Sequence, residues 1–146
     1  MEYYLKFTVG DISFAAPIDE VTEIVRPRDV EIASKGAKNL MGHFNLRGDR
    51  VPIFDLPVFL EIGQTGSFEI IVSRIDHIAV GFKVNRVFGI VSVESQLPFP
   101  DIVKAKDFMP GVIPDQDSFL QVLSFRKILS GTRGAVFKKD RSPAVK

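Results

Sequence analysis

Short apolar runs separated by turn-forming residues constrain the fold of this chain more than any other feature. Alternating apolar residues occupy 3–9, 68–74 and 87–93, and turn signals such as Gly10-Asp11 and Ile75-Asp76 stand between runs. Many short strands at this spacing are typical of an all-β barrel or sandwich. We therefore predict an all-β fold with a few short helices.

The same pattern orders the expected elements. A β-hairpin is predicted over 3–16, and Pro17 is expected to open one helical turn, since proline suits the first helical position. Weak helical spacing between 39 and 46 predicts a short helix that ends near Gly42, with Gly42 as a left-handed cap. We also expect a helical turn over 57–62, loops over 101–118, a helix over 124–129, and strands over 21–26, 68–74, 77–84, 87–93 and 119–123.

Composition excludes several classes of protein. The 146 residues include no cysteine, which rules out disulfides, thiol catalysis and zinc sites with cysteine ligands. The net charge is +1, of which residues 138–146 carry +3, so residues 1–137 sum to −2. A nucleic-acid-binding barrel should carry its positive charge on the fold itself, which argues against that function. The chain is basic after residue 131 with little to bury, and we predict a disordered tail over 132–146.

The most specific sequence pattern surrounds a polar turn at 45–50. N-L-R-G at 45–48 is followed by V-P-I-F-D-L at 51–56. Gly48 supplies a backbone that tolerates positive φ in a tight turn, and Pro52 suits only an edge or the start of a strand. On local chemistry alone, this pattern indicates a plain hairpin.

Further blocks stand on both sides of that turn. F-A-A-P-I-D-E-V-T-E-I occupies 14–24, Gly42 begins G-H-F-N-L-R-G, and V-G-F-K-V-N-R-V-F-G-I occupies 80–90. In this order and spacing the blocks resemble the CheW-like domain family, the coupling and docking modules of bacterial chemosensory arrays. The resemblance implies two side-by-side five-stranded SH3-like β-barrels, with the chain ends crossing between them. It makes residues 1–131 one domain of two intertwined barrels.

The resemblance also implies a function in protein–protein contact. It implies a non-enzymatic coupling protein without a cofactor, which binds the regulatory domain of a CheA-type histidine kinase. A groove between the barrels is implied to accept the cytoplasmic tip of a chemoreceptor. We expect a monomer in isolation, located in the cytoplasm and recruited to membrane-attached receptor arrays without inserting into the membrane. The residues implied for partner binding are Val21, Glu23, Gly42, Asn45, Arg47, Gly48, Val84 and Val87.

Within this set, the resemblance places Glu23 and Arg47 near each other. A bidentate pair would orient the turn for a partner, whereas the alternative is a surface salt bridge of little consequence. We expect a partner to need the missing side chain of Gly42. The chain departs from the family at Ser124 and Phe125, where Asp and Leu are usual, so the surface of the second barrel and the partner stay open.

Catalytic and metal-binding patterns are absent from the sequence. His43 and His77 stand in no metal-ligand spacing. Prolines interrupt the irregular series Asp101, Asp107, Asp115 and Asp117, which is typical of solvated loop carboxylates. No run of 18 apolar residues predicts a membrane span, and no basic-then-apolar N-terminus predicts export. The functions left open are a scaffold of another chemosensory pathway such as pilus-driven or gliding motility, a competitor for array sites, and a nucleic-acid-binding barrel.

Overall fold

The computed structural model describes residues 1–26, 28–32, 38–64, 66–98 and 106–133. Its strands are β1 (Glu2–Val9), β2 (Ile12–Pro17), β3 (Glu23–Val25), β4 (Val30–Ile32), β5 (Leu40–Leu46), β6 (Asp49–Phe54), β7 (Glu69–Ile75), β8 (Ile78–Val84), β9 (Arg86–Val93), β10 (Val112–Asp115) and β11 (Ser118–Val122). Its helices are the 3₁₀ turn η1 (Ile18–Glu20), α1 (Leu56–Leu60) and α2 (Phe125–Arg133).

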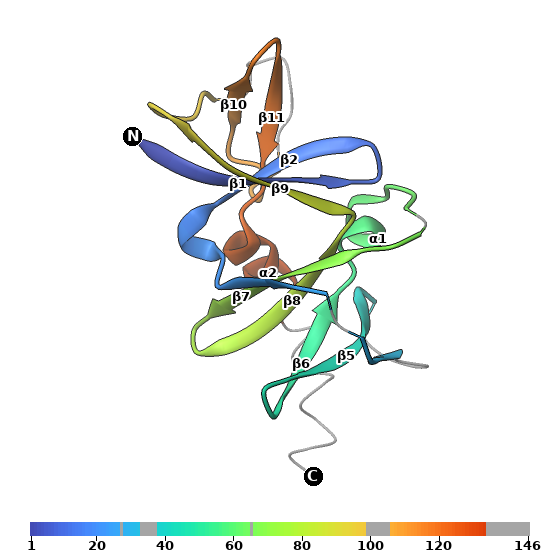
Figure 1. Cartoon of the computed structure of the whole chain (residues 1–146). Helices are drawn as coiled ribbons and strands as arrows, with labels where there is room; N and C mark the ends of the chain where they lie inside the picture. Colours follow the sequence, from blue (N-terminus) through green and yellow to red (C-terminus); the bar gives the residue numbers. More distant parts are fainter. Residues whose placement is uncertain (27, 33–37, 65, 99–105, 134–146) are drawn as a thin grey trace.

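The strands form two curled sheets (Figure 1). One has five strands in the order β10-β11-β2-β1-β9, and the other has six in the order β3-β7-β8-β6-β5-β4. Both chain ends therefore contribute to the first sheet, while the middle of the chain builds the second. An isolated bridge between Leu97 and Val112 draws the chain after β9 toward β10, the opposite edge of the five-stranded sheet. The predicted all-β architecture with two barrel-like halves is confirmed, and one half has an additional strand, β4.

Phenylalanine fills the core between the two sheets. Phe7 of β1, Phe54 of β6 and Phe82 of β8 are all fully buried. Phe125 of α2 stacks on Phe82 with ring centroids 4.2 Å apart, and its ring lies 6.0 Å from that of Phe7. Burying a side chain of this size stabilises a fold by about 1.5–3 kcal/mol. The helix α2 thus joins the two sheets, and a smaller apolar cluster lies within each sheet.

The predicted helix near Gly42 is wrong, because residues 40–46 form strand β5. The apolar spacing over 39–46, which suggested a helix, also suits a strand that has a neighbouring strand on each side. In the structure, β5 pairs with both β4 and β6. Gly42 lies opposite Ile32 of β4 and has no positive φ, so it caps no helix. Tertiary pairing overrides weak local preference in such short segments.

The stretch predicted as loop over 101–118 contains strand β10, the edge strand of the five-stranded sheet. Pro114 within β10 is tolerated because an edge strand needs fewer hydrogen-bond donors. Pro52, expected at an edge or strand start, lies inside β6, where parallel pairing with β8 begins only at the next residue. The C-terminal helix extends to Arg133, two residues into the predicted tail, and residues 134–146 lie outside the described residues.

Candidate functional site

The N-L-R-G motif forms the tip of the β5–β6 hairpin, as its chemistry predicted. Arg47 and Gly48 have positive φ angles of 50° and 92°, as in the tight turns that match the twist of a hairpin. The side-chain Oδ1 of Asn45 accepts a hydrogen bond of 2.9 Å from the backbone N–H of Gly48. Asn45 therefore holds the turn, and Gly48 supplies its conformation, so both position Arg47.

Arg47 and Glu23 form an exposed bidentate ion pair. Nη1 of Arg47 donates to Oε1 of Glu23 at 3.1 Å, and Nη2 donates to Oε2 at 2.5 Å. The hydrogen bond from Arg47 holds the pKa of Glu23 below its ordinary value, and Glu23 in turn raises the pKa of Arg47. Because β3 is an edge of the six-stranded sheet and the hairpin lies near its other edge, the pair spans the curled sheet.

The predicted valines do not share one environment. Val21 and Val87 are half-buried and pack against the core between the sheets. Val84 is fully buried in that core, so its side chain cannot contact a partner on the surface. The apolar part of the predicted site is therefore reduced to the exposed portions of Val21 and Val87.

Gly42 also has a different role from the one expected of it. It is buried under β4, and a Cβ built on Gly42 would lie 2.0 Å from the carbonyl oxygen of Glu31. The missing side chain therefore makes room for a neighbouring strand of this chain. No partner is needed to explain this glycine.

Glu69 is a buried carboxylate whose contacts the sequence analysis missed. Its Oε1 accepts a hydrogen bond of 2.7 Å from the N–H of Val87, and its Oε2 accepts one of 2.8 Å from Nε of Arg26. Burial raises the pKa of Glu69, but these two hydrogen bonds and the charges of Arg26 and Arg86 together outweigh burial, and the net pKa is lowered. Alternation along 68–74 around Ile70 and Val72 placed residue 69 on the outer face, so no sequence signal pointed to this contact.

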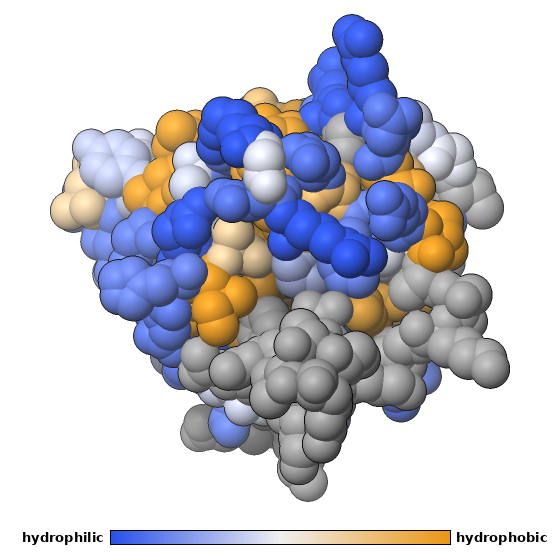
Figure 2. Space-filling view, turned by 90° about the horizontal axis from the view of Figure 1, so that it is seen from below, coloured by the Kyte–Doolittle hydropathy of each residue, from blue (hydrophilic) through white to orange (hydrophobic). Residues whose placement is uncertain are grey.

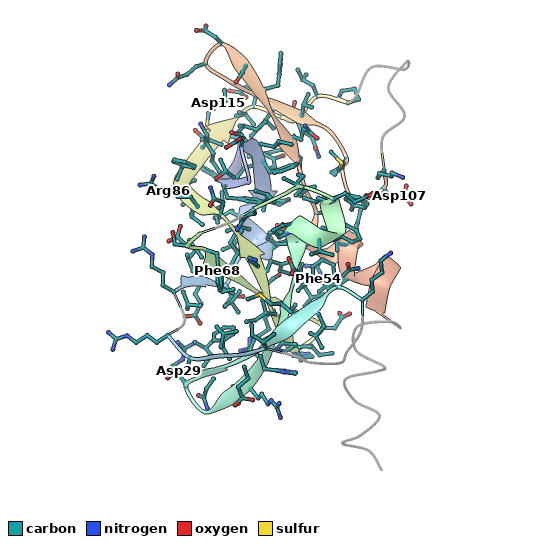
Figure 3. All side chains as sticks on the ribbon, turned by 90° about the vertical axis from the view of Figure 1, so that its right-hand side faces the viewer. Asp29, Phe54, Phe68, Arg86, Asp107 and Asp115 are labelled. Atoms are coloured by element: carbon teal, nitrogen blue, oxygen red, sulfur yellow. The ribbon has the colours of Figure 1, made fainter. Side chains whose placement is uncertain are left out.

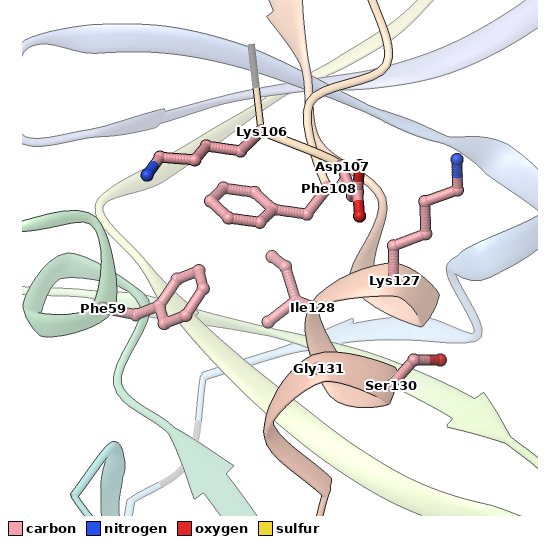
Figure 4. Close-up of a pocket in the computed structure, with 8 residues that line it drawn as sticks. All are labelled: Phe59, Lys106, Asp107, Phe108, Lys127, Ile128, Ser130 and Gly131. Atoms are coloured by element: carbon pink, nitrogen blue, oxygen red, sulfur yellow. The ribbon is translucent and has the colours of Figure 1, made fainter. Parts of the chain in front are cut away.

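An apolar hollow of about 680 Å³ lies between α1 and α2 (Figure 4). Phe59, Phe108 and Ile128 face one another across it, with the two phenylalanine rings 5.0 Å apart. Lys106 and Lys127 stand at its rim. The lower face of the molecule is different, because hydrophilic side chains prevail among its described residues and the apolar ones form small separate patches (Figure 2).

The described residues contain no group of three or more His, Cys, Asp or Glu side chains that could hold a metal ion. His77 lies exposed in the turn between β7 and β8, while His43 is half-buried in β5. Of the aspartates considered, Asp115 forms an ion pair of 2.7 Å with Lys6, and Asp101 lies outside the described residues. Across the described helices, none has the length and apolar character that a membrane crossing requires.

Comparison with known proteins identifies the family of this chain. A model described as the CheW-like domain matches residues 3–133. A curated relative named chemotaxis protein CheW, from Thermotoga maritima, is 29% identical over 101 residues, which covers 67% of each chain. Another protein of that name, from Treponema pallidum, is 25% identical over 136 residues and covers 85% of this chain and 79% of its own.

A solved structure is similar to most of this chain. It is the scaffolding protein TtCheW from Thermoanaerobacter tengcongensis, which aligns with a TM-score of 0.74 at 22% identity. The alignment covers 84% of this chain and 88% of that one. At this identity the likeness supports the fold, including the pair of curled sheets.

Proposed function

The chain belongs to the CheW-like domain family, and we propose that it is a chemotaxis scaffold that couples chemoreceptors to a histidine kinase. One partner is the regulatory domain of a CheA-type kinase, and the other is the helical tip of a receptor's cytoplasmic region. The relatives named chemotaxis protein CheW support a role in chemotaxis. The protein acts through binding alone and performs no chemistry on its partners.

The exposed Glu23–Arg47 pair is the observation that carries this proposal. The side chain of Arg47 is 69% exposed although both of its Nη groups are held in place by Glu23. An exposed ion pair contributes little to the stability of a fold, but one with fixed geometry adds specificity to a contact. Glu23 of β3 holds the Arg47 side chain, and two further residues of the turn, Asn45 and Gly48, hold its backbone. This arrangement of an exposed side chain suits the binding of a partner.

The apolar part of the contact is supplied by Val21, which lies between η1 and β3, and by Val87 of β9. A receptor tip is a helical hairpin, and a helix that lies in a groove is anchored by apolar side chains spaced along one face. Half-buried valines at the junction of the sheets suit that kind of contact. The Glu23–Arg47 pair then sets the orientation of the helix.

A retention assay tests the proposal. The immobilised chain is incubated separately with the regulatory domain of the CheA-type kinase and with the receptor tip from the same genome. Both should be retained by the wild type, and Arg47→Ala should weaken retention of the receptor tip, the kinase domain or both. The matched control is Arg126→Gln, which removes an exposed cation on α2. Retention of neither partner by the wild type would exclude the coupling function.

The proposal also places the chain at receptor arrays on the inner side of the membrane. A fluorescent fusion should gather in clusters that disperse when the receptors are deleted. A uniform distribution in cells that contain both receptor and kinase would contradict recruitment to arrays.

A further inference from the structure

A second hollow lies where the chain crosses from the six-stranded to the five-stranded sheet. Its volume is about 410 Å³, and its lining residues are Arg26, Ser67, Phe68, Glu69, Asn85 and Arg86. Arg26 directly follows β3, and Arg86 begins β9. In Figure 3, Arg86 lies at the left-hand edge of the molecule, and Phe68 lies between Arg86 and Phe54. The hollow is distinct from the Glu23–Arg47 pair, which lies at the other end of β3.

Positive charge exceeds negative charge in this hollow. The Glu69 carboxylate is already engaged by the N–H of Val87 and by Nε of Arg26. A guanidinium carries five N–H donors, so the bond through Nε leaves both Nη groups of Arg26 to solvent. Its side chain is 81% exposed. Arg86 is exposed as well, which gives the hollow two guanidinium groups against one carboxylate that is already hydrogen-bonded.

An exposed aromatic ring stands directly beside the hollow. The guanidinium carbon of Arg86 lies 5.7 Å from the centre of the Phe88 ring, and Nζ of Lys6 lies 5.8 Å from it. Phe88 is 55% exposed, and Ile90 on the same strand is 61% exposed. An apolar surface therefore continues from the hollow along β9, bordered by Arg86 and by the ion pair of Lys6 with Asp115.

A β-bulge turns Phe88 to this position. Lys6 pairs with Gly89 and Phe7 pairs with Val87, so Phe88 is the extra residue of β9 opposite β1. Gly89 has a φ of 129°, a conformation that glycine adopts readily and other residues do not. Bulges of this kind redirect side chains next to functional sites. The exposure of Phe88 is thus built into the backbone.

We propose that this hollow binds the carboxylate of an acidic side chain on a partner protein, whose neighbouring apolar side chain packs against Phe88. Guanidinium groups bind carboxylates through paired charge-assisted hydrogen bonds. A free anion would use only the arginines, whereas an acidic and apolar segment of protein uses the aromatic ring as well. That the ligand is a protein rests on the proposed function. The site would extend the partner contact at the Glu23–Arg47 pair along β3 and β9.

The test measures binding of a fluorescein-labelled peptide of alternating Glu and Leu residues by fluorescence anisotropy. A matched peptide with Gln in place of every Glu serves as the ligand control. We expect the wild type to bind the Glu peptide about tenfold more tightly, since removing one well-paired charge contact typically costs about that factor. The preference should decrease as NaCl is raised, because salt screens exposed charges.

Three variants locate the contact on the protein. Arg86→Gln and Phe88→Ser should each weaken binding of the Glu peptide about tenfold, and Arg126→Gln should leave it unchanged. Arg26→Gln is a less clean variant because it also removes a bond to Glu69. Melting curves of each variant establish that the fold is retained.

Several results would overturn the proposal. Equal affinity for the Glu and Gln peptides would exclude a carboxylate site, and equal losses in Arg86→Gln and Arg126→Gln would show non-specific attraction. Displacement of the peptide by millimolar inorganic phosphate, together with an unaffected Phe88→Ser variant, would reveal a simple anion site. If the Glu peptide binds but neither kinase nor receptor is retained, the carboxylate site stands and the coupling function is excluded. If kinase and receptor are retained but the Glu peptide does not bind, only the carboxylate site is excluded.

Discussion

The carboxylate of Glu20 accepts a hydrogen bond of 2.6 Å from the backbone N–H of Phe125, which stands 105 residues later in the chain. The same carboxylate accepts bonds from Oγ of Ser124 at 2.9 Å and from the N–H of Arg126 at 3.3 Å. A negative charge at the start of a helix satisfies its free N–H groups and opposes the positive end of its dipole. The turn η1 thus fixes the N-terminus of α2, the helix that joins the two sheets.

Replacement of Glu20 by alanine should destabilise the fold by about 3 kcal/mol. The change leaves buried donors of Ser124 and Phe125 without an acceptor, and hydrogen bonds to charged groups contribute about 1.5–3 kcal/mol. Urea unfolding measures the loss. The neighbouring exposed residue provides a control, since Asp19→Ala should change stability by less than about 0.5 kcal/mol. Equal stability of the Glu20 variant and the wild type would show that α2 needs no cap.

Phe125→Leu should destabilise the fold because Phe125 stacks on Phe82, although leucine is usual at this position in the family. The substitution removes an aromatic contact at 4.2 Å and leaves part of the volume empty, and we expect a loss of about 1–2 kcal/mol. Phe119→Leu is the matched control, because Phe119 is 61% exposed and should tolerate the change. Thermal unfolding distinguishes the two variants, and a similar effect of both would contradict the central position of Phe125.

Gly42→Ala should separate β4 from β5 and cost about 1–3 kcal/mol, because the new Cβ overlaps the carbonyl of Glu31. Gly42→Asp should be at least as harmful, since it introduces the same Cβ. Gly131 of α2 should show the opposite effect on stability when it is replaced by alanine. A Cβ on Gly131 meets nothing within 4 Å, so Gly131→Ala should stabilise α2 by up to about 1 kcal/mol. A Gly42→Asp protein as stable as the wild type would refute this account of β4.

The stability that Glu69 contributes should depend on pH. Its folded-state pKa lies below the unfolded value of about 4.3, so the contribution is fully present above that unfolded value and is lost as the pH falls through the folded pKa. The stability difference between wild type and Glu69→Gln should therefore be largest at neutral pH and shrink in acid. Urea unfolding at several pH values measures it. Glu94→Gln, at an exposed position, should show no difference, and a constant difference for Glu69 would contradict the ion pair with Arg26.

Arg47→Ala should retain the fold and lose partner binding. The pair with Glu23 is exposed, so its removal should leave the melting temperature near that of the wild type. Binding to the kinase domain and receptor tip should decrease clearly, and Glu23→Gln should produce the same pattern because Arg47 then loses its orientation. A large fall in melting temperature would instead make the pair a structural element of the barrel.

Local chemistry predicted the elements that depend on neighbouring residues. The turn at Arg47-Gly48 follows from the need for positive φ. A helical turn does follow Pro17, but Pro17 ends β2 and stands just before the turn, with an extended ψ of 133°, instead of opening it as predicted. The sequence blocks at 14–24, 42–56 and 80–90 led to the correct family and fold. The helix near Gly42 was predicted wrongly, and strands β4 and β10 were missed, because short strands gain their stability from pairing partners that lie far away in the chain.

The sequence by itself determined the turns, the all-β class and the nearness of Glu23 to Arg47, because these depend on local backbone preferences and on a pattern of residues that is specific to a family. Only the tertiary structure decided which residues reach the surface. Val84 lies in the core, Gly42 makes room for β4, and Glu20 and Glu69 bind backbone groups of distant elements. The reason is physical, since curling a sheet brings together edges that are far apart in the chain and sets burial residue by residue.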